Sequence, residues 1–277
     1  METSFKERCV ELRKDGRSIM EIMRITGRPK TSIYQHIRHI PLSTERWMQI
    51  KKAAAEHIRK FPTARKGKSI RPFKPFSSWT PKLVLLVAHL SFDGELCHGT
   101  CAYNNRSMML LERVQNLMRL VYDFDPAQYT NPLTGVRRIS YYNVALSAYL
   151  KQKSTDLLNT IHALPVVSQK EFLRAFFDDE GCMDFRLKRN IRRIRGYQKN
   201  TNTLFVCQKL LENFNIQSHI EMPNEIVISG KENLRRFQQL IDFSKGVRIN
   251  GNRSNSVWRK SIEKRVLLDR AIKSFKT

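Results

Sequence analysis

The sequence has no long hydrophobic run, and this absence excludes a membrane-spanning helix. Its longest apolar stretch, residues 83–90, is far shorter than the roughly 20 residues that a helix needs to cross a bilayer. The first eight residues also lack the apolar core of a signal peptide. We therefore expect a soluble intracellular protein with no membrane partner, located in the cytoplasm or, in a eukaryotic host, in an organelle.

Cysteine is also scarce, and its spacing argues against a disulfide framework or a zinc site. The five cysteines are Cys9, Cys97, Cys101, Cys182 and Cys207. His98 lies between Cys97 and Cys101, but no second pair of ligands follows at zinc-site spacing. We therefore predict five reduced thiols.

Acidic residues are half as frequent as basic ones. The 277 residues include 25 Asp and Glu against 50 Lys and Arg, which gives a formal net charge of +25. Such an excess predicts a polyanionic partner, with nucleic acid as the first candidate and the ribosome or an anionic membrane surface as competitors. The length allows one to two domains with their own cores.

The first forty residues (1–40) predict a module of three helices. Breaks at residues 15–16 and 26–29 separate them, and two short helices joined by a glycine-containing turn resemble the helix-turn-helix of resolvase-like regulators. The resemblance implies that the third helix lies in the major groove, with Ile33 and Ile37 facing the core. Its expected DNA-facing residues are Thr31, Ser32, Gln35 and Arg38. A capping module without a DNA role is the alternative.

Residues 41–79 predict a helix followed by a basic linker. The helix is expected to run to about residue 59, and residues 60–75 then contain six basic residues, no acidic residue and several prolines. A linker of this composition suits the DNA backbone or the minor groove. A solvated tether is the alternative interpretation.

Two similar stretches, Leu86–Gly94 and Leu173–Gly181, organise the rest of the chain. Each is an apolar helical run with a central alanine, and each ends in an acidic residue followed by glycine. The two acids, Asp93 and Glu180, are 87 positions apart. Helices that cross closely at the alanines would bring both carboxylates to one end of a shared axis, which predicts a divalent-metal site.

The surrounding pattern predicts a tandem repeat of one structural unit, over residues 80–165 and 166–277. Each copy has the order helix, strand, strand, helix, strand, strand, helix. Residues 80–277, about 70% of the chain, resemble a single-chain LAGLIDADG homing endonuclease. The resemblance implies an α+β fold in which a pseudo-two-fold tandem of αββαββα units follows the all-α helix-turn-helix domain. The first copy departs from the motif at His89 and Ser91, but not at its terminal acid.

The resemblance also implies a chemistry. A monomeric enzyme of this family would hydrolyse both strands of double-stranded DNA at a long recognition site, with Mg²⁺ held by the catalytic Asp93 and Glu180 and by the carbonyls of Phe92 and Asp179. Asp178 is expected to cap or pair locally. A non-cleaving WhiA-like regulator and an RNA maturase remain alternatives; retention of both acids favours the enzyme.

Basic residues predict how DNA is contacted. Residues 186–199 contain seven basic residues and no acidic one, alternating with apolar residues as a hairpin in the major groove requires. These expected DNA-binding residues are Arg186, Lys188, Arg189, Arg192, Arg193, Arg195 and Lys199. Residues 95–105 of the first copy contain no Lys or Arg, so we expect an unequal DNA surface. The resemblance further implies a basic residue near the metals that supports the transition state, for which the candidates are Lys151, Lys153, Lys245 and Arg248.

Overall fold

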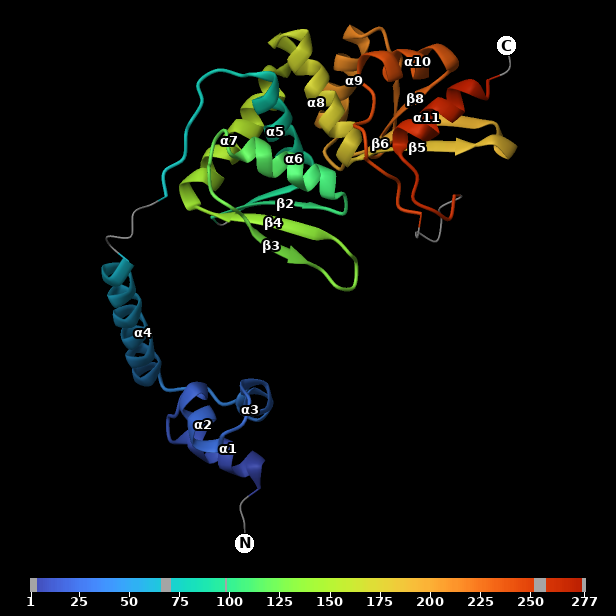
Figure 1. Ribbon diagram of the computed structural model, residues 1–277. Helices are drawn as coiled ribbons and strands as arrows, with labels where there is room; N and C mark the ends of the chain where they lie inside the picture. The colour runs from blue at the N-terminus through green and yellow to red at the C-terminus, as the bar shows by residue number, and fades with distance from the viewer. Residues whose placement is uncertain (1–3, 66–70, 98, 252–257, 276–277) are drawn as a thin grey trace. The chain divides into compact units, whose positions relative to one another are not determined.

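The computed structural model describes residues 4–65, 71–97, 99–251 and 258–275, without the side chains of residues 57–65. The chain divides into two compact units, Met1–Ser69 and Ile70–Thr277, each with its own core (Figure 1).

The smaller unit is entirely helical. Ser4 and Ser18 begin the first two helices as capping boxes, in which each serine side chain accepts from a backbone N–H and the glutamate three residues later accepts from the serine N–H. Gly27 ends the second helix with a φ of 64°, a conformation that favours glycine. The elements are α1 (Phe5–Lys14), α2 (Ile19–Thr26), α3 (Lys30–Ile37) and α4 (Thr44–Arg65). Their core contains Cys9, Leu12, Ile22, Ile33 and Ile37.

Helix α4 is longer than the sequence predicted. We expected it to end near residue 59 because of Pro62, but it continues to Arg65. A proline in a helix removes one backbone hydrogen bond, and the helix can continue past it at a cost. The expected linker therefore loses its first residues to α4, and residues 66–70 lie outside the described part of the chain.

The first repeat of the larger unit forms a four-stranded antiparallel sheet with helices. Thr80 caps its first helix by accepting from the Leu83 N–H, and Pro81 occupies the first helical position. The elements are α5 (Pro81–Phe92), β1 (Gly94–Cys97), β2 (Thr100–Asn105), α6 (Met108–Met118), β3 (Ala127–Thr130), β4 (Arg137–Tyr142) and α7 (Val144–Thr160). The sheet order is β1-β2-β4-β3.

The second repeat has the same order of elements and the same sheet topology, β5-β6-β8-β7. Its elements are α8 (Val166–Asp179), β5 (Gly181–Arg186), β6 (Ile191–Tyr197), α9 (Thr201–Asn213), β7 (His219–Glu221), β8 (Glu225–Ser229) and α10 (Lys231–Leu240). The α+β fold class with two tandem αββαββα units is therefore confirmed. A further helix, α11 (Lys264–Lys273), was not predicted.

Helices α5 and α8 pack along each other at the centre of this unit, with the rest of the two repeats on either side (Figure 1). Both alanines of the motif, Ala88 and Ala175, are fully buried. The ring of Phe92 lies edge-on to Phe172 and Phe176, with centroid distances of 5.4 and 5.3 Å. One continuous apolar core therefore spans both repeats.

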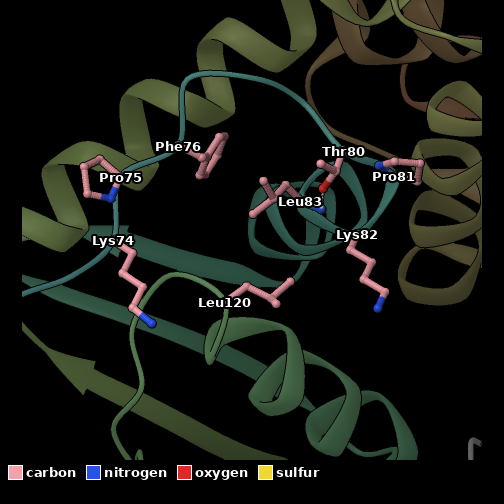
Figure 2. Close-up of a pocket in the computed structure, with 8 residues that line it drawn as sticks. All are labelled: Lys74, Pro75, Phe76, Thr80, Pro81, Lys82, Leu83 and Leu120. Carbon is pink, nitrogen blue, oxygen red and sulfur yellow. Dashed lines mark hydrogen bonds between the residues drawn. The ribbon is translucent and has the colours of Figure 1, made fainter.

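Residues 71–79, expected as part of the linker, pack on the first repeat as a strap. The backbone N–H of Lys74 donates to the Val121 carbonyl at 2.6 Å. The Tyr149 hydroxyl accepts from the Phe76 N–H at 2.7 Å and donates to the Phe76 carbonyl at 2.9 Å. A mostly apolar groove with a volume of about 550 Å³ lies beside the strap, at the start of α5 and the end of α6. Figure 2 shows the residues that line it. It is lined by Lys74, Pro75, Phe76, Thr80, Pro81, Lys82, Leu83 and Leu120.

Replacing Tyr149 with phenylalanine tests whether the strap is a structural part of the larger unit. The change removes both hydrogen bonds to Phe76 and leaves the ring, so we expect the free energy of unfolding in urea to fall by about 1–3 kcal/mol. Tyr142→Phe is the control, because Tyr142 is 71% exposed and its change should cost less than about 0.5 kcal/mol. Equal effects of the two substitutions would contradict this role.

Candidate functional site

The two motif acids cap the C-termini of the paired helices. Asp93 follows α5 and Glu180 follows α8, and each is succeeded by the first residue of a strand, Gly94 or Gly181. A Cβ on Gly94 would lie 2.0 Å from the Leu90 carbonyl oxygen, and one on Gly181 would lie 2.5 Å from that of Phe177. The chain can therefore turn from helix to strand directly after the acid only if glycine follows.

Both carboxylates lie in an environment that disfavours their charge. Burial raises the pKa of Asp93 to about 8, and the nearby charges of Asp179 and Glu180 add to this shift. Burial and the charge of Asp179 raise the pKa of Glu180 to about 7. The hydrogen bond from Asn105 and the charge of Lys264 oppose the shift of Asp93. A bound cation would relieve the remaining cost.

Neighbouring polar groups hold Asp93 and Asp179 in place. Asn105 Nδ2 donates to Asp93 Oδ2 at 2.7 Å. The Tyr103 hydroxyl donates to Asp179 Oδ1 at 2.7 Å, and His89 Nδ1 lies 2.8 Å from Asp179 Oδ2. Burial and the charge of Asp179 raise the pKa of Tyr103 well above its usual value, so this hydroxyl stays a donor. His89, a departure from the motif, therefore has a specific partner on the opposite helix.

Asp178 was expected to cap or pair locally, but its partners are distant in the sequence. Arg113 Nη1, from α6 of the first repeat, donates to Asp178 Oδ2 at 3.0 Å. The Ser244 backbone N–H donates to Asp178 Oδ1 at 2.8 Å. This carboxylate links the two repeats.

Lys264, at the start of the unpredicted α11, is a buried cation whose charge acts on both motif acids. Its Nζ donates to the carbonyls of Phe177 and Asp178 at 3.1 and 2.7 Å, at the C-terminal end of α8. Burial lowers the pKa of Lys264, while the charges of Asp178, Asp179 and Asp93 oppose the shift. No local sequence pattern predicts this contact, because it spans 86 residues and α11 lies outside the repeated unit.

Two of the four residues predicted to support a transition state contact other residues of the protein. The Lys153 ammonium lies among three aromatic rings, 5.0 Å from the centroid of Phe76, 5.7 Å from Trp79 and 5.6 Å from Tyr149. Arg248 donates to the side chain and carbonyl of Ser261, both at 3.1 Å. Lys151 and Lys245 are exposed.

The donor set suits a hard divalent cation. Among the described residues, no three His, Cys, Asp or Glu side chains converge as a complete metal site. Two carboxylates with raised pKa values at one end of a helix pair are still oxygen ligands that gain from a cation, and Mg²⁺ commonly takes its remaining ligands from phosphate and water. The residues present therefore fit Mg²⁺ bound by Asp93 and Glu180.

The basic hairpin of the second repeat carries its own counter-charges. The register of β5 and β6 places Asp184 opposite Arg193, and Arg193 also pairs with Glu221 of β7 at 3.1 Å. Arg186 Nε donates to Asp184 at 2.8 Å, and Arg195 Nε donates to Glu225 of β8 at 2.8 Å. Residues 186–199 contain no acid, but the neighbouring strands supply three. Lys188, Arg189 and Lys199 are exposed.

Strand geometry separates Arg192 from the other predicted DNA-binding arginines of β6. Successive side chains of a strand alternate between faces, so Arg192 lies opposite the face of Arg193. Its guanidinium donates to the side chain and carbonyl of Ser274, at 2.7 and 3.0 Å, and lies 4.9 Å from the ring centroid of Phe275. Arg192 therefore anchors the end of α11.

The sheet of the first repeat offers few free cations. Arg138 of β4 forms an ion pair with Glu95 of β1, and Arg106 Nε donates to the Thr134 carbonyl at 3.0 Å. In the smaller unit, Ile33 and Ile37 of α3 are buried. Of the residues expected to face DNA there, Thr31, Gln35 and Arg38 are exposed and Ser32 is partly exposed.

Comparison with known proteins identifies the class of fold. Residues 168–242 match the sequence model of the LAGLIDADG-like domain. Together with the two tandem sheets, this match defines a LAGLIDADG fold. A search of curated proteins returned no match. In the described part of the chain, no helix combines the length and hydrophobicity needed to cross a membrane.

Several solved structures resemble the chain at low sequence identity. The N-terminal LAGLIDADG domain of DUF199/WhiA matches with a TM-score of 0.46 and 19% identity, over 62% of this chain and 88% of that one. Full-length DUF199/WhiA from Thermatoga maritima gives 0.48 and 18%, over 74% of this chain and 63% of that one. I-DmoI in complex with DNA and Mn gives 0.44 and 17%, over 58% of this chain and 96% of that one.

The raised pKa values predict that the metal-free protein loses stability as the pH rises. The folded-state pKa values of about 8 and about 7 lie above those of an unfolded chain. At any pH between the unfolded and the folded pKa values, the folded state therefore binds more protons than the unfolded state. This stability is present at low pH and lost as the pH rises through 7 and 8. In a chelator, we expect the melting temperature to fall by about 4 °C or more from pH 6 to pH 9.

The double variant Asp93→Asn, Glu180→Gln isolates this effect, because it removes both titrating groups and keeps their shapes. Its melting temperature should fall by less than half as much over the same pH range. An unchanged pH dependence in the variant would show that other groups cause it.

Proposed function

We propose that this chain is a site-specific, metal-dependent DNA endonuclease of the homing type, which hydrolyses both strands of a long recognition site as a monomer. The observation that carries the proposal is the pair of carboxylates, one from each repeat, at the same end of two packed helices. The LAGLIDADG-like match over residues 168–242 supports it, since this family includes metal-dependent DNA endonucleases.

The chain's own groups divide the work as follows. Asp93 and Glu180 hold Mg²⁺, which when bound would activate a water and stabilise charge on the phosphate oxygens. Asn105 fixes the orientation of the Asp93 carboxylate through its hydrogen bond. Lys264 holds the last carbonyls of α8 and so fixes the helix end from which Glu180 projects. In the family, the carbonyls of Phe92 and Asp179 would complete the protein ligands.

DNA would be bound by both units. In the second repeat, the exposed Lys188, Arg189 and Lys199 would contact phosphates, and Arg186, Arg193 and Arg195 would read bases. Asp184 and Glu225 fix the orientation of these arginines by ion pairs. Guanidinium groups held in one orientation suit bidentate contact with guanine. In the smaller unit, α3 would enter the major groove as the second helix of a helix-turn-helix. Its exposed residues would be the contacts.

A non-cleaving DNA-binding regulator of the WhiA type is the second candidate. The observation that favours it is the neutralised face of the second sheet, because arginines already paired with Asp184, Glu221 and Glu225 contribute less to phosphate binding. A buried Lys264 also offsets part of the acids' charge without a metal.

The test is incubation of the purified chain with Mg²⁺ and plasmids carrying candidate intron-insertion sites. The wild type should convert its target plasmid to the linear form. Asp93→Asn and Glu180→Gln should still bind the site but should cut at least about 100-fold more slowly, because each loses a metal ligand. Glu212→Gln, a change of an exposed acid on α9, is the matched control and should cut at the wild-type rate.

The same assay separates the candidates. A wild type that binds one DNA site tightly and never nicks it in Mg²⁺ would establish the regulator. Tight binding of a structured intron RNA, without a preferred DNA site, would favour an RNA maturase.

A further inference from the structure

The contacts between the two motif helices are equivalent in position but opposite in chemistry. The motifs are offset by 87 residues, so His89 of α5 corresponds to Phe176 of α8, and Phe92 corresponds to Asp179. Across the helix pair, Phe92 packs on Phe176 with a centroid distance of 5.3 Å. The equivalent contact joins His89 Nδ1 to Asp179 Oδ2 at 2.8 Å. We name these the apolar contact and the polar contact.

The strands beside each contact carry the same complementarity. Tyr103 is opposite Gly94 in the register of β1 and β2, and Gly196 is opposite Gly181 in the register of β5 and β6, so the two positions are equivalent. At the polar contact, the Tyr103 hydroxyl donates to Asp179, and its ring lies 5.8 Å from that of His89. At the apolar contact, a Cβ on Gly196 would lie 2.4 Å from Phe176 Cε1. The large Tyr103 therefore accompanies the smaller polar contact, and Gly196 makes room for the larger apolar contact.

We propose that these six residues form a pairing code that makes the first repeat accept only the second repeat as its partner. The first repeat carries His89, Phe92 and Tyr103. The second repeat carries Phe176, Asp179 and Gly196. Each set satisfies the other and not itself, so neither two first repeats nor two second repeats can form this interface.

The cost of pairing like with like follows from burial. Two second repeats would place Asp179 against Phe176 at both contacts, and the side chain of Asp179 is fully buried here. A buried carboxylate without its partner is strongly destabilising. Two first repeats would place His89 against Phe92 and leave the Tyr103 hydroxyl without its acceptor.

The code also makes the two halves of the acid site unequal. Asn105 Nδ2 donates to Asp93 Oδ2 at 2.7 Å and to the Tyr103 hydroxyl at 3.3 Å. A chain of hydrogen bonds therefore connects Asp93 with the polar contact. Correct pairing guarantees that the site receives one acid from each repeat, and it does so whether or not the protein cuts DNA.

The test transplants the polar contact to the apolar side. Phe92→Asp places an unpaired carboxylate at a partly buried position against the fully buried Phe176 and should lower the folding equilibrium constant at least about tenfold in urea denaturation of the full chain. Adding Phe176→His recreates an imidazole–carboxylate pair and should restore at least about tenfold of that loss. The control combines Phe92→Asp with Phe177→His and should show no rescue. The native Phe177 ring packs on Phe237, with a centroid distance of 4.9 Å.

The native polar contact provides the complementary measurement at the same pH and without metal. His89→Leu and Asp179→Leu should each lower the folding equilibrium constant, and the double variant should lose at least about tenfold less than the product of the two losses. The proposal is overturned if the native pair shows no coupling, or if Phe176→His rescues no better than Phe177→His. Neither readout involves DNA or metal, so failure here is distinct from failure of the proposed endonuclease.

Discussion

The cost of ionising two partly buried carboxylates is the constraint on which the larger unit depends. Asp93 and Glu180 sit at the C-termini of α5 and α8, where the helix dipoles already disfavour negative charge, and burial raises their pKa values to about 8 and about 7. The apolar faces of the two helices hold the acids there in spite of this cost. Gly94 and Gly181 then let each chain leave the helix without a clash.

The surroundings offset the cost of ionising these two acids only in part, and unequally. On the side of Asp93, Asn105, Tyr103 and His89 form a hydrogen-bonded chain that also includes Asp179. On the side of Glu180, the buried Lys264 holds the carbonyls that end α8. Neither arrangement is repeated: Phe176 and Gly196 occupy the positions equivalent to His89 and Tyr103, and α11 lies outside the repeated unit. The duplicated scaffold therefore carries a site whose halves differ in chemistry.

The sequence predicted whatever depends on local pattern. The two motifs, their terminal acids and the order of elements in each repeat follow from apolar periodicity and acid-glycine endings, and the structure has them. Contacts between distant residues were not predictable in this way. Arg192 looked like its neighbours, but the pleat of β6 turns it toward Ser274. Lys153 lies among aromatic rings brought by the strap, and Lys264 reaches α8 from a helix outside the repeat.

The most direct test of this account is whether a divalent cation offsets the cost of ionising Asp93 and Glu180. Adding Mn²⁺ to the full chain without DNA should raise its melting temperature, and more at pH 8 than at pH 6, because binding requires ionised carboxylates. In the Asp93→Asn, Glu180→Gln variant, Mn²⁺ should leave the melting temperature unchanged. An equal rise in the wild type and the variant would contradict the account, since the cation would then bind elsewhere.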